Sequence, residues 1–244
     1  MGARKPVFDW SILDRNGLAN YLWELHPKFV NQELTTKEFH SLLYRHITKV
    51  LPVKVSKKLD YKVELNYVFI GGTYYSDYDK ERKKCIEVVF VYNPFYDTIK
   101  MTKKRFLRLC YCFSDTVLHE IIHMRQFRRR KFKDLPEYES NAAKSEQRQE
   151  QSYLGSSDEI DAYGFNIACE LMDRFDYNQN KVIKHLNLNQ RGIRTKGDCW
   201  KMYLKAFGHD HNHAIIKRVK KKIIRYLPHA ESGKPYRNKD WIGR

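Results

Sequence analysis

Hydrophobic residues recur at helical spacing along residues 103–127, a stretch that contains neither Pro nor Gly. The apolar positions are Phe106, Leu109, Phe113, Val117 and Ile121 or Ile122. Because side chains three or four residues apart share one face of an α-helix, this pattern predicts a long helix with one buried face.

Alternating apolar and polar residues predict two strands before this helix. One covers residues 61–70 and ends at Gly71-Gly72, and the other covers residues 86–92 and is stopped by Asn93-Pro94. Together they would form a small sheet.

Helical patterns dominate both ends of the chain. At the N-terminus we expect two helices, whose apolar positions are Trp10, Leu13, Leu18, Tyr21 and Leu22 in the first and Phe39, Leu42, Leu43, His46, Ile47 and Val50 in the second. After residue 156 the pattern predicts a helix from Ser156 to about Met172, short helices over 182–188, 200–207 and 215–227, and an extended tail after Pro228. The polar segment 133–155 is expected to be a surface insertion, either a mobile lid or a disordered connector.

These elements predict an α+β fold in which a small sheet packs on a central helix. We expect one compact unit with three parts: a helical cover over residues 1–58, a core over 59–190, and a basic helical part with a tail over 191–244.

The predicted central helix carries His119-Glu120-Ile121-Ile122-His123. Two His four residues apart lie one turn apart on the same helix face, where their ring nitrogens can bind one Zn²⁺ while Glu120 points to a metal-bound water. A core helix with two ordinary His is the alternative interpretation.

A catalytic zinc site usually has three protein ligands and leaves a fourth position for water, so a third ligand is needed. Glu159 is the best candidate, because Ser156 and the acidic residues after it predict the start of a second helix. Asp158, Asp161 or a His of the segment 209–213 could bind instead. Glu159 could also be a carboxylate that only stabilises the helix N-terminus.

With His119, Glu120 and His123, Glu159 followed by Ala162, and Gln126 three residues after the second His, the chain resembles the zincin metallopeptidases. The resemblance covers about residues 105–171 and is closest to the gluzincins, whose ligands are two His and a Glu. It implies a zinc-dependent protease, in which the edge strand of the sheet binds an extended substrate, a role that residues 86–92 could have here. Tyr163 stands where the thermolysin type has Asp.

A more distant resemblance is to the SprT-like proteases, which act on DNA-bound proteins. Residues 197–200 partly match, but Lys196 occupies the position of the expected third His. The segment 209–213, which contains three His, more simply caps the helix that follows it.

If zinc is bound, it lowers the pKa of a coordinated water and polarises the scissile carbonyl. Glu120 then accepts the proton and passes it to the leaving amine. Tyr153 and Tyr163 are candidate donors to the oxyanion, with packed core aromatics as the alternative interpretation. The expected substrate is a protein or peptide.

The formal charge of +17 is concentrated in two blocks. The residues that could contact nucleic acid are Arg128, Arg129, Arg130, Lys220, Lys221 and Lys222. Such blocks neutralise phosphates, but solvated helix faces or an acidic protein substrate would explain the same charge.

Five Cys without a C-x-x-C pair, a basic N-terminus and no apolar run of roughly eighteen residues predict a protein of a reducing cytosol that neither enters a membrane nor carries a secretion signal. A Lys- and Tyr-rich basic chain also fits a virus-encoded protein of the host cytosol or virion. The two alternatives to a protease are a basic nucleic-acid-binding protein with a structural zinc and a catalytically idle zincin scaffold with an assembly role in a virion.

Overall fold

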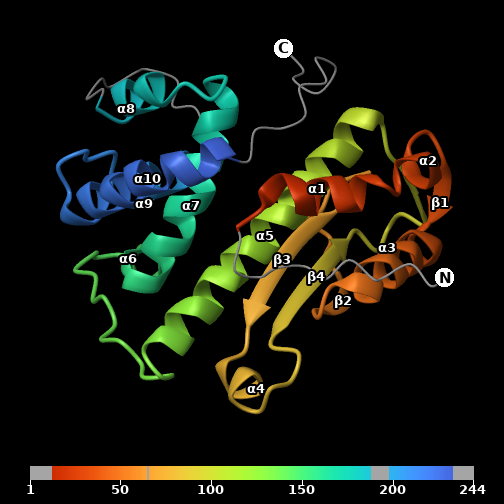
Figure 1. The fold of residues 1–244 in the computed structure, drawn as a ribbon, viewed down its shortest axis with the longest axis horizontal. Helices are drawn as coiled ribbons and strands as arrows, with labels where there is room; N and C mark the ends of the chain where they lie inside the picture. Colours follow the sequence, from red (N-terminus) through yellow and green to blue (C-terminus); the bar gives the residue numbers. More distant parts are fainter. Residues whose placement is uncertain (1–12, 65, 188–197, 233–244) are drawn as a thin grey trace. The chain divides into compact units, whose positions relative to one another are not determined.

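The computed structural model describes residues 13–64, 66–187 and 198–232, and Trp10, Lys196, Gly197 and the end of the tail lie outside these ranges. The chain is α+β, as the sequence predicts, and most of its elements are helices (Figure 1). The described residues divide into two compact units, which lie on either side of the boundary between Arg125 and Gln126. The division falls inside the long helix α5, Lys103–Arg129.

The first unit contains a three-stranded sheet with the order β2-β4-β3. The strands are β2 (Lys54–Leu59), β3 (Phe69–Tyr74) and β4 (Ile86–Tyr92). β2 is parallel to β4, whereas β3 is antiparallel to it with Gly72 opposite Val88. Two further strands, β1 (Glu33–Thr35) and β5 (Thr98–Lys100), form a separate antiparallel pair.

The sheet corrects the expectations for two strands. Residues 61–67 alternate in sequence, but a turn follows Asp60 and Asn66 has a left-handed φ of 57°, so strand β3 begins only at Phe69. Residues 86–92 form a strand as predicted, but β4 is central and paired on both sides, so it cannot be the substrate-binding edge. The outer strands of this sheet are β2 and β3.

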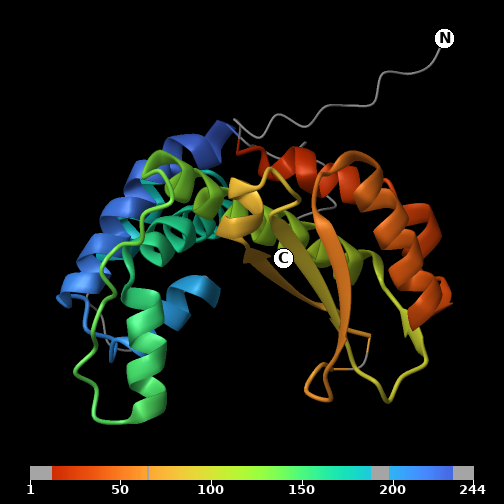
Figure 2. The ribbon, with the colours of Figure 1, turned by 90° about the horizontal axis from the view of Figure 1, so that it is seen from below.

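Helices α1 (Arg15–Trp23), α2 (His26–Phe29), α3 (Thr36–Val50) and α4 (Ser76–Lys80) complete the first unit (Figures 1 and 2). The Phe90 ring of β4 lies 6.2 Å from the His40 ring of α3 and 6.4 Å from the Phe113 ring of α5. One side chain contacts both helices, so α3 and α5 cover the same face of the sheet.

The predicted apolar stripe of α5 is the core of the first unit. Phe106, Phe113 and Val117 are fully buried, and the Phe106 ring stacks on Phe29 of α2 with centroids 5.0 Å apart. Arg15 of α1 forms an ion pair with Asp115 of α5 at 2.5 Å, which fixes the first helix against the long one.

The second unit is helical and contains α6 (Ser145–Gly155), α7 (Ser157–Arg174), α8 (Gln179–Asn187), α9 (Asp198–Ala206) and α10 (Ala214–Ser232). Helix α10 packs against α7, and a Cβ on Gly164 of α7 would lie only 2.7 Å from the Cβ of Lys222. Gly164 therefore permits a close approach of the two helices.

The structure changes two expectations for the second unit and confirms a third. The segment 133–155 is not a structureless connector, because it contains α6, which contacts α7 and α9 and buries Leu154. Helix α10 continues through Pro228 to Ser232, so the chain after Pro228 is not extended at once. Capping by the His-rich segment is confirmed, since His213 Nδ1 accepts a hydrogen bond of 3.2 Å from Ile215 N.

Candidate metal centre

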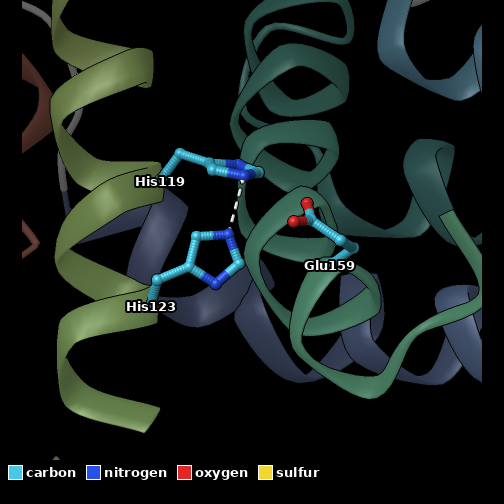
Figure 3. Close-up of side chains that lie close together, drawn as sticks. All are labelled: His119, His123 and Glu159. Atoms are coloured by element: carbon cyan, nitrogen blue, oxygen red, sulfur yellow. Dashed lines mark hydrogen bonds between the residues drawn. The ribbon is translucent and has the colours of Figure 1, made fainter. Parts of the chain in front are cut away.

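His119 and His123 project from the same side of α5, one turn apart (Figure 3). Their Nε2 atoms are 3.1 Å apart, and their rings are nearly perpendicular at 77°. Two ligand nitrogens at about 2.0–2.1 Å from one tetrahedral Zn²⁺ would be about 3.3 Å apart. The imidazole pair therefore has a separation that fits a single ion.

Glu159 lies at the third position of α7, where the Ser156 hydroxyl accepts a hydrogen bond of 3.3 Å from the Glu159 backbone N–H. This is the cap that the sequence predicts. A full capping box occurs at α3, where the Glu38 carboxylate binds the backbone N–H of Thr35 at 2.9 Å. At α7 only the serine half of such a box is present among the hydrogen bonds of the described residues.

The two His and Glu159 each offer one ligand atom, and these three atoms lie within 4.8 Å of one another. In Figure 3 the Glu159 carboxylate points toward the two imidazoles. Nitrogen, nitrogen and carboxylate oxygen are a common ligand set for catalytic Zn²⁺. The donors fit the metal that the sequence predicts.

The competing carboxylates of α7 bind cations instead. Asp158 accepts two hydrogen bonds of 2.7 Å from the guanidinium of Arg130, in a bidentate pair. Asp161 accepts a hydrogen bond of 2.6 Å from Lys222 Nζ, and Gln126 donates to its second oxygen at 3.3 Å. Both competing carboxylates thus have cationic partners within the second unit.

Gln126 connects the last turn of α5 to the first turn of α7. Its amide Nε2 donates to the backbone carbonyl of Asp158 at 3.0 Å, and the side chain is 5% exposed. Since Gln126 lies three residues after His123 on a continuous helix, this bond orients the start of α7 relative to the end of α5. Gln126 is one of the residues on which the resemblance to the zincins rests.

Glu120 is buried, with 6% of its surface exposed, and faces the sheet of the first unit. A Cβ on Gly72 of β3 would lie 2.6 Å from Glu120 Oε1. The glycine at this strand position therefore leaves room for the carboxylate.

Tyr153 and Tyr163, the predicted oxyanion donors, belong to a group of rings around Glu159. The Tyr153 and Tyr163 ring centroids are 6.5 Å apart, and Tyr163 lies 5.7 Å from the ring of Tyr203. Desolvation and then the charge of Glu159 raise the pKa of Tyr153, although 51% of this residue is exposed. A raised pKa leaves the hydroxyl protonated at neutral pH, where it can donate.

Tyr203 also belongs to this group of rings around Glu159, although the sequence does not predict it. Its ring is fully buried, and its hydroxyl donates to the carbonyl of Leu154 at 3.0 Å. Burial and the charge of Glu159 raise its pKa well above the usual value. Only the helical spacing of α9 predicts that Tyr203 is buried, and nothing in the local sequence indicates its neighbours.

The six basic residues that could contact nucleic acid separate into two sets. Arg129, Arg130, Lys221 and Lys222 line one cavity of the second unit, whereas Arg128 and Lys220 are not among its lining residues. Burial, and secondarily the charge of Lys217, lower the pKa of Lys220.

No protein-family model, curated protein or solved structure matches this chain. No helix in the described part of the chain is both long and apolar enough to cross a membrane.

Proposed function

We propose that this protein is a zinc-dependent metallopeptidase of the zincin type. His119, His123 and Glu159 would hold the ion, and Glu120 would act as the general base. The observation that carries the proposal is the grouping of the three ligand atoms within 4.8 Å of one another. The substrate would be a protein or peptide.

Bound Zn²⁺ supplies Lewis-acid chemistry, because it lowers the pKa of a coordinated water and polarises a carbonyl. The chain supplies the proton transfers. The Glu120 carboxylate accepts a proton from the attacking water and delivers it to the amine that leaves when the peptide bond breaks. Tyr153 and Tyr163 are the candidate donors to the oxygen that becomes negatively charged.

Strand β3 supports the choice of an extended peptide as substrate. It pairs with β4 on one side, and among the described strands no other lies on its second side. A peptide can add to such an edge through backbone hydrogen bonds. Because Gly72 of this strand lies against Glu120, a peptide bound along β3 would run close to the general base.

The proposal is tested on the purified full chain by measuring its zinc content and its cleavage of a library of quenched fluorescent peptides. We expect about one zinc per chain in the wild type and in Glu120→Gln, because Glu120 is not a proposed ligand. Cleavage by Glu120→Gln should fall by about 10²- to 10⁴-fold, the usual contribution of a general base.

Glu146→Gln is the matched control, since this carboxylate is exposed on α6. It should retain both zinc and activity. A wild-type chain that binds no zinc at micromolar concentration would refute the proposal. Zinc binding without any cleavage would favour a structural zinc or an idle scaffold.

A further inference from the structure

A cavity of about 470 Å³ lies in the second unit between the end of α5, the first turn of α7 and helix α10. Six cations line it together with two carboxylates, a formal excess of four positive charges. The cations are Arg129, Arg130, Arg218, Lys221, Lys222 and Arg225. This basic pocket includes none of the proposed zinc ligands.

Two of the six cations are neutralised within the pocket. Arg130 pairs with Asp158, and Lys222 pairs with Asp161. Among the described residues, Arg129, Lys221 and Arg225 form no ion pair, and all three are exposed. The excess charge therefore faces solvent.

The basic residues of α10 are arranged along one helix face. Arg218, Lys221, Lys222 and Arg225 follow the spacing i, i+3, i+4 and i+7, which aligns them over about 10 Å of the helix axis. A row of this length exceeds one phosphate group. It suits consecutive phosphates of a strand better than a single small anion.

Two other features favour an anion with phosphate geometry. Four of the six cations are Arg, whose planar guanidinium binds phosphate oxygens through two parallel hydrogen bonds. Ser157 and Asp158 at the start of the 18-residue helix α7 also line the pocket, so the positive end of the helix dipole adds to the field. The Ser157 hydroxyl already accepts a hydrogen bond of 2.9 Å from Arg218.

We propose that the basic pocket binds consecutive phosphates of a nucleic-acid strand, without reading its bases. The inference does not depend on the proposed peptidase function. Contacts of this kind release counterions, so binding must weaken as salt rises.

The test is fluorescence anisotropy with a labelled 20-nucleotide single strand and the matching duplex, titrated with the full chain at several salt concentrations. The pocket variant is Arg129→Ala/Lys221→Ala/Arg225→Ala. The control variant is Lys181→Ala/Lys184→Ala/Lys205→Ala, which removes the same charge from exposed positions of α8 and α9.

We expect the pocket variant to bind at least about tenfold more weakly and its salt slope to fall by about two, as for three lost phosphate contacts on a single strand. The control variant should bind within about twofold of the wild type. If the triple variant unfolds at a lower temperature, Lys221→Ala/Arg225→Ala is compared with Lys181→Ala/Lys184→Ala, which removes the same charge.

Equal weakening by both variants would overturn the proposal, because diffuse attraction would then explain binding. Absence of wild-type binding at 50 mM salt would do the same. Displacement of the oligonucleotide by millimolar inorganic phosphate would indicate a small-anion site instead. Equal displacement by a polyglutamate peptide would indicate an acidic protein partner.

Discussion

Gly72 of β3 and Glu120 of α5 are in such close contact that a Cβ at position 72 would lie 2.6 Å from the Glu120 oxygen Oε1. It would also lie 2.7 Å from Cγ2 of Thr116. The Glu120 carboxylate therefore occupies the space that a side chain at position 72 would need, and only glycine leaves that space free.

Gly72→Ala is expected to displace the Glu120 carboxylate, because the carboxylate is the end of a flexible side chain. Peptide cleavage should fall by about 10- to 100-fold, in line with the cost of misplacing a catalytic group by about 1 Å. Zinc content should not change. Both are measured on the same sample by a cleavage assay and metal analysis.

Gly71→Ala is the control on the neighbouring residue. The atom closest to its added Cβ is Phe69 Cε1 at 4.0 Å, an ordinary contact. Similar losses of cleavage in both variants would mean that the strand backbone, and not Glu120, is disturbed.

Glu159→Gln is expected to lower zinc affinity by more than about tenfold, since an amide oxygen carries no charge to bind the ion. His123→Ala should lower it further. Competition with a chelator of known affinity measures both effects.

Asp161→Asn is expected to keep the zinc affinity of the wild type, because Asp161 binds Lys222 and Gln126. It should instead destabilise the second unit by about 1.5–3 kcal/mol, the contribution of hydrogen bonds to a charged group. Loss of zinc from this variant and not from Glu159→Gln would identify Asp161 as the third ligand.

Tyr153→Phe and Tyr163→Phe test the predicted oxyanion donors. The hydroxyl that donates to the oxyanion should lower kcat by about 10²- to 10³-fold when it is removed, with zinc content unchanged. Tyr203→Phe should lower the thermal stability and leave kcat nearly unaltered, because its hydroxyl binds the Leu154 carbonyl. If neither Tyr153→Phe nor Tyr163→Phe changes kcat, the donor is another group.

Glu87 of β4 should make the first unit sensitive to acid. Burial alone would raise its pKa, but hydrogen bonds from Tyr75, Ser56 and Lys54 and the charge of Lys54 lower it below the usual 4.5. A lowered folded-state pKa contributes stability that is complete above about 4.5 and is lost as the pH falls through the lower folded value.

Urea unfolding from pH 7 to pH 3 measures this dependence. The free energy of unfolding of Glu87→Gln should depend less on pH below the usual carboxyl range than that of the wild type. Glu64→Gln, at an exposed position, should follow the wild-type curve. Identical curves for all three proteins would show that Glu87 does not contribute.

The sequence alone predicts the elements whose signals are local. Helix α5, its buried face and the one-turn spacing of His119 and His123 follow from periodicity within a single segment. The start of α7 follows from Ser156, because a cap acts on residues that are only a few positions away.

Strand pairing and side-chain partners required the tertiary structure. The strand β2 escapes prediction because only Val55 is buried in this Lys-rich edge strand. Residues 61–67 alternate in sequence, but the described residues 61–64, 66 and 67 belong to no strand. The order β2-β4-β3 makes β3 an edge, and no local pattern records that order.

The candidate sites also required the tertiary structure, because their residues come from segments that are distant in the sequence. The sequence ranks Glu159 above Asp158 and Asp161 as a ligand, but only the structure shows that Asp158 binds Arg130 and Asp161 binds Lys222. The basic pocket joins residues 129–130 to residues 218–225, nearly ninety positions apart in the chain. Local sequence determines which face a residue occupies, whereas the packing of distant segments determines what that face meets.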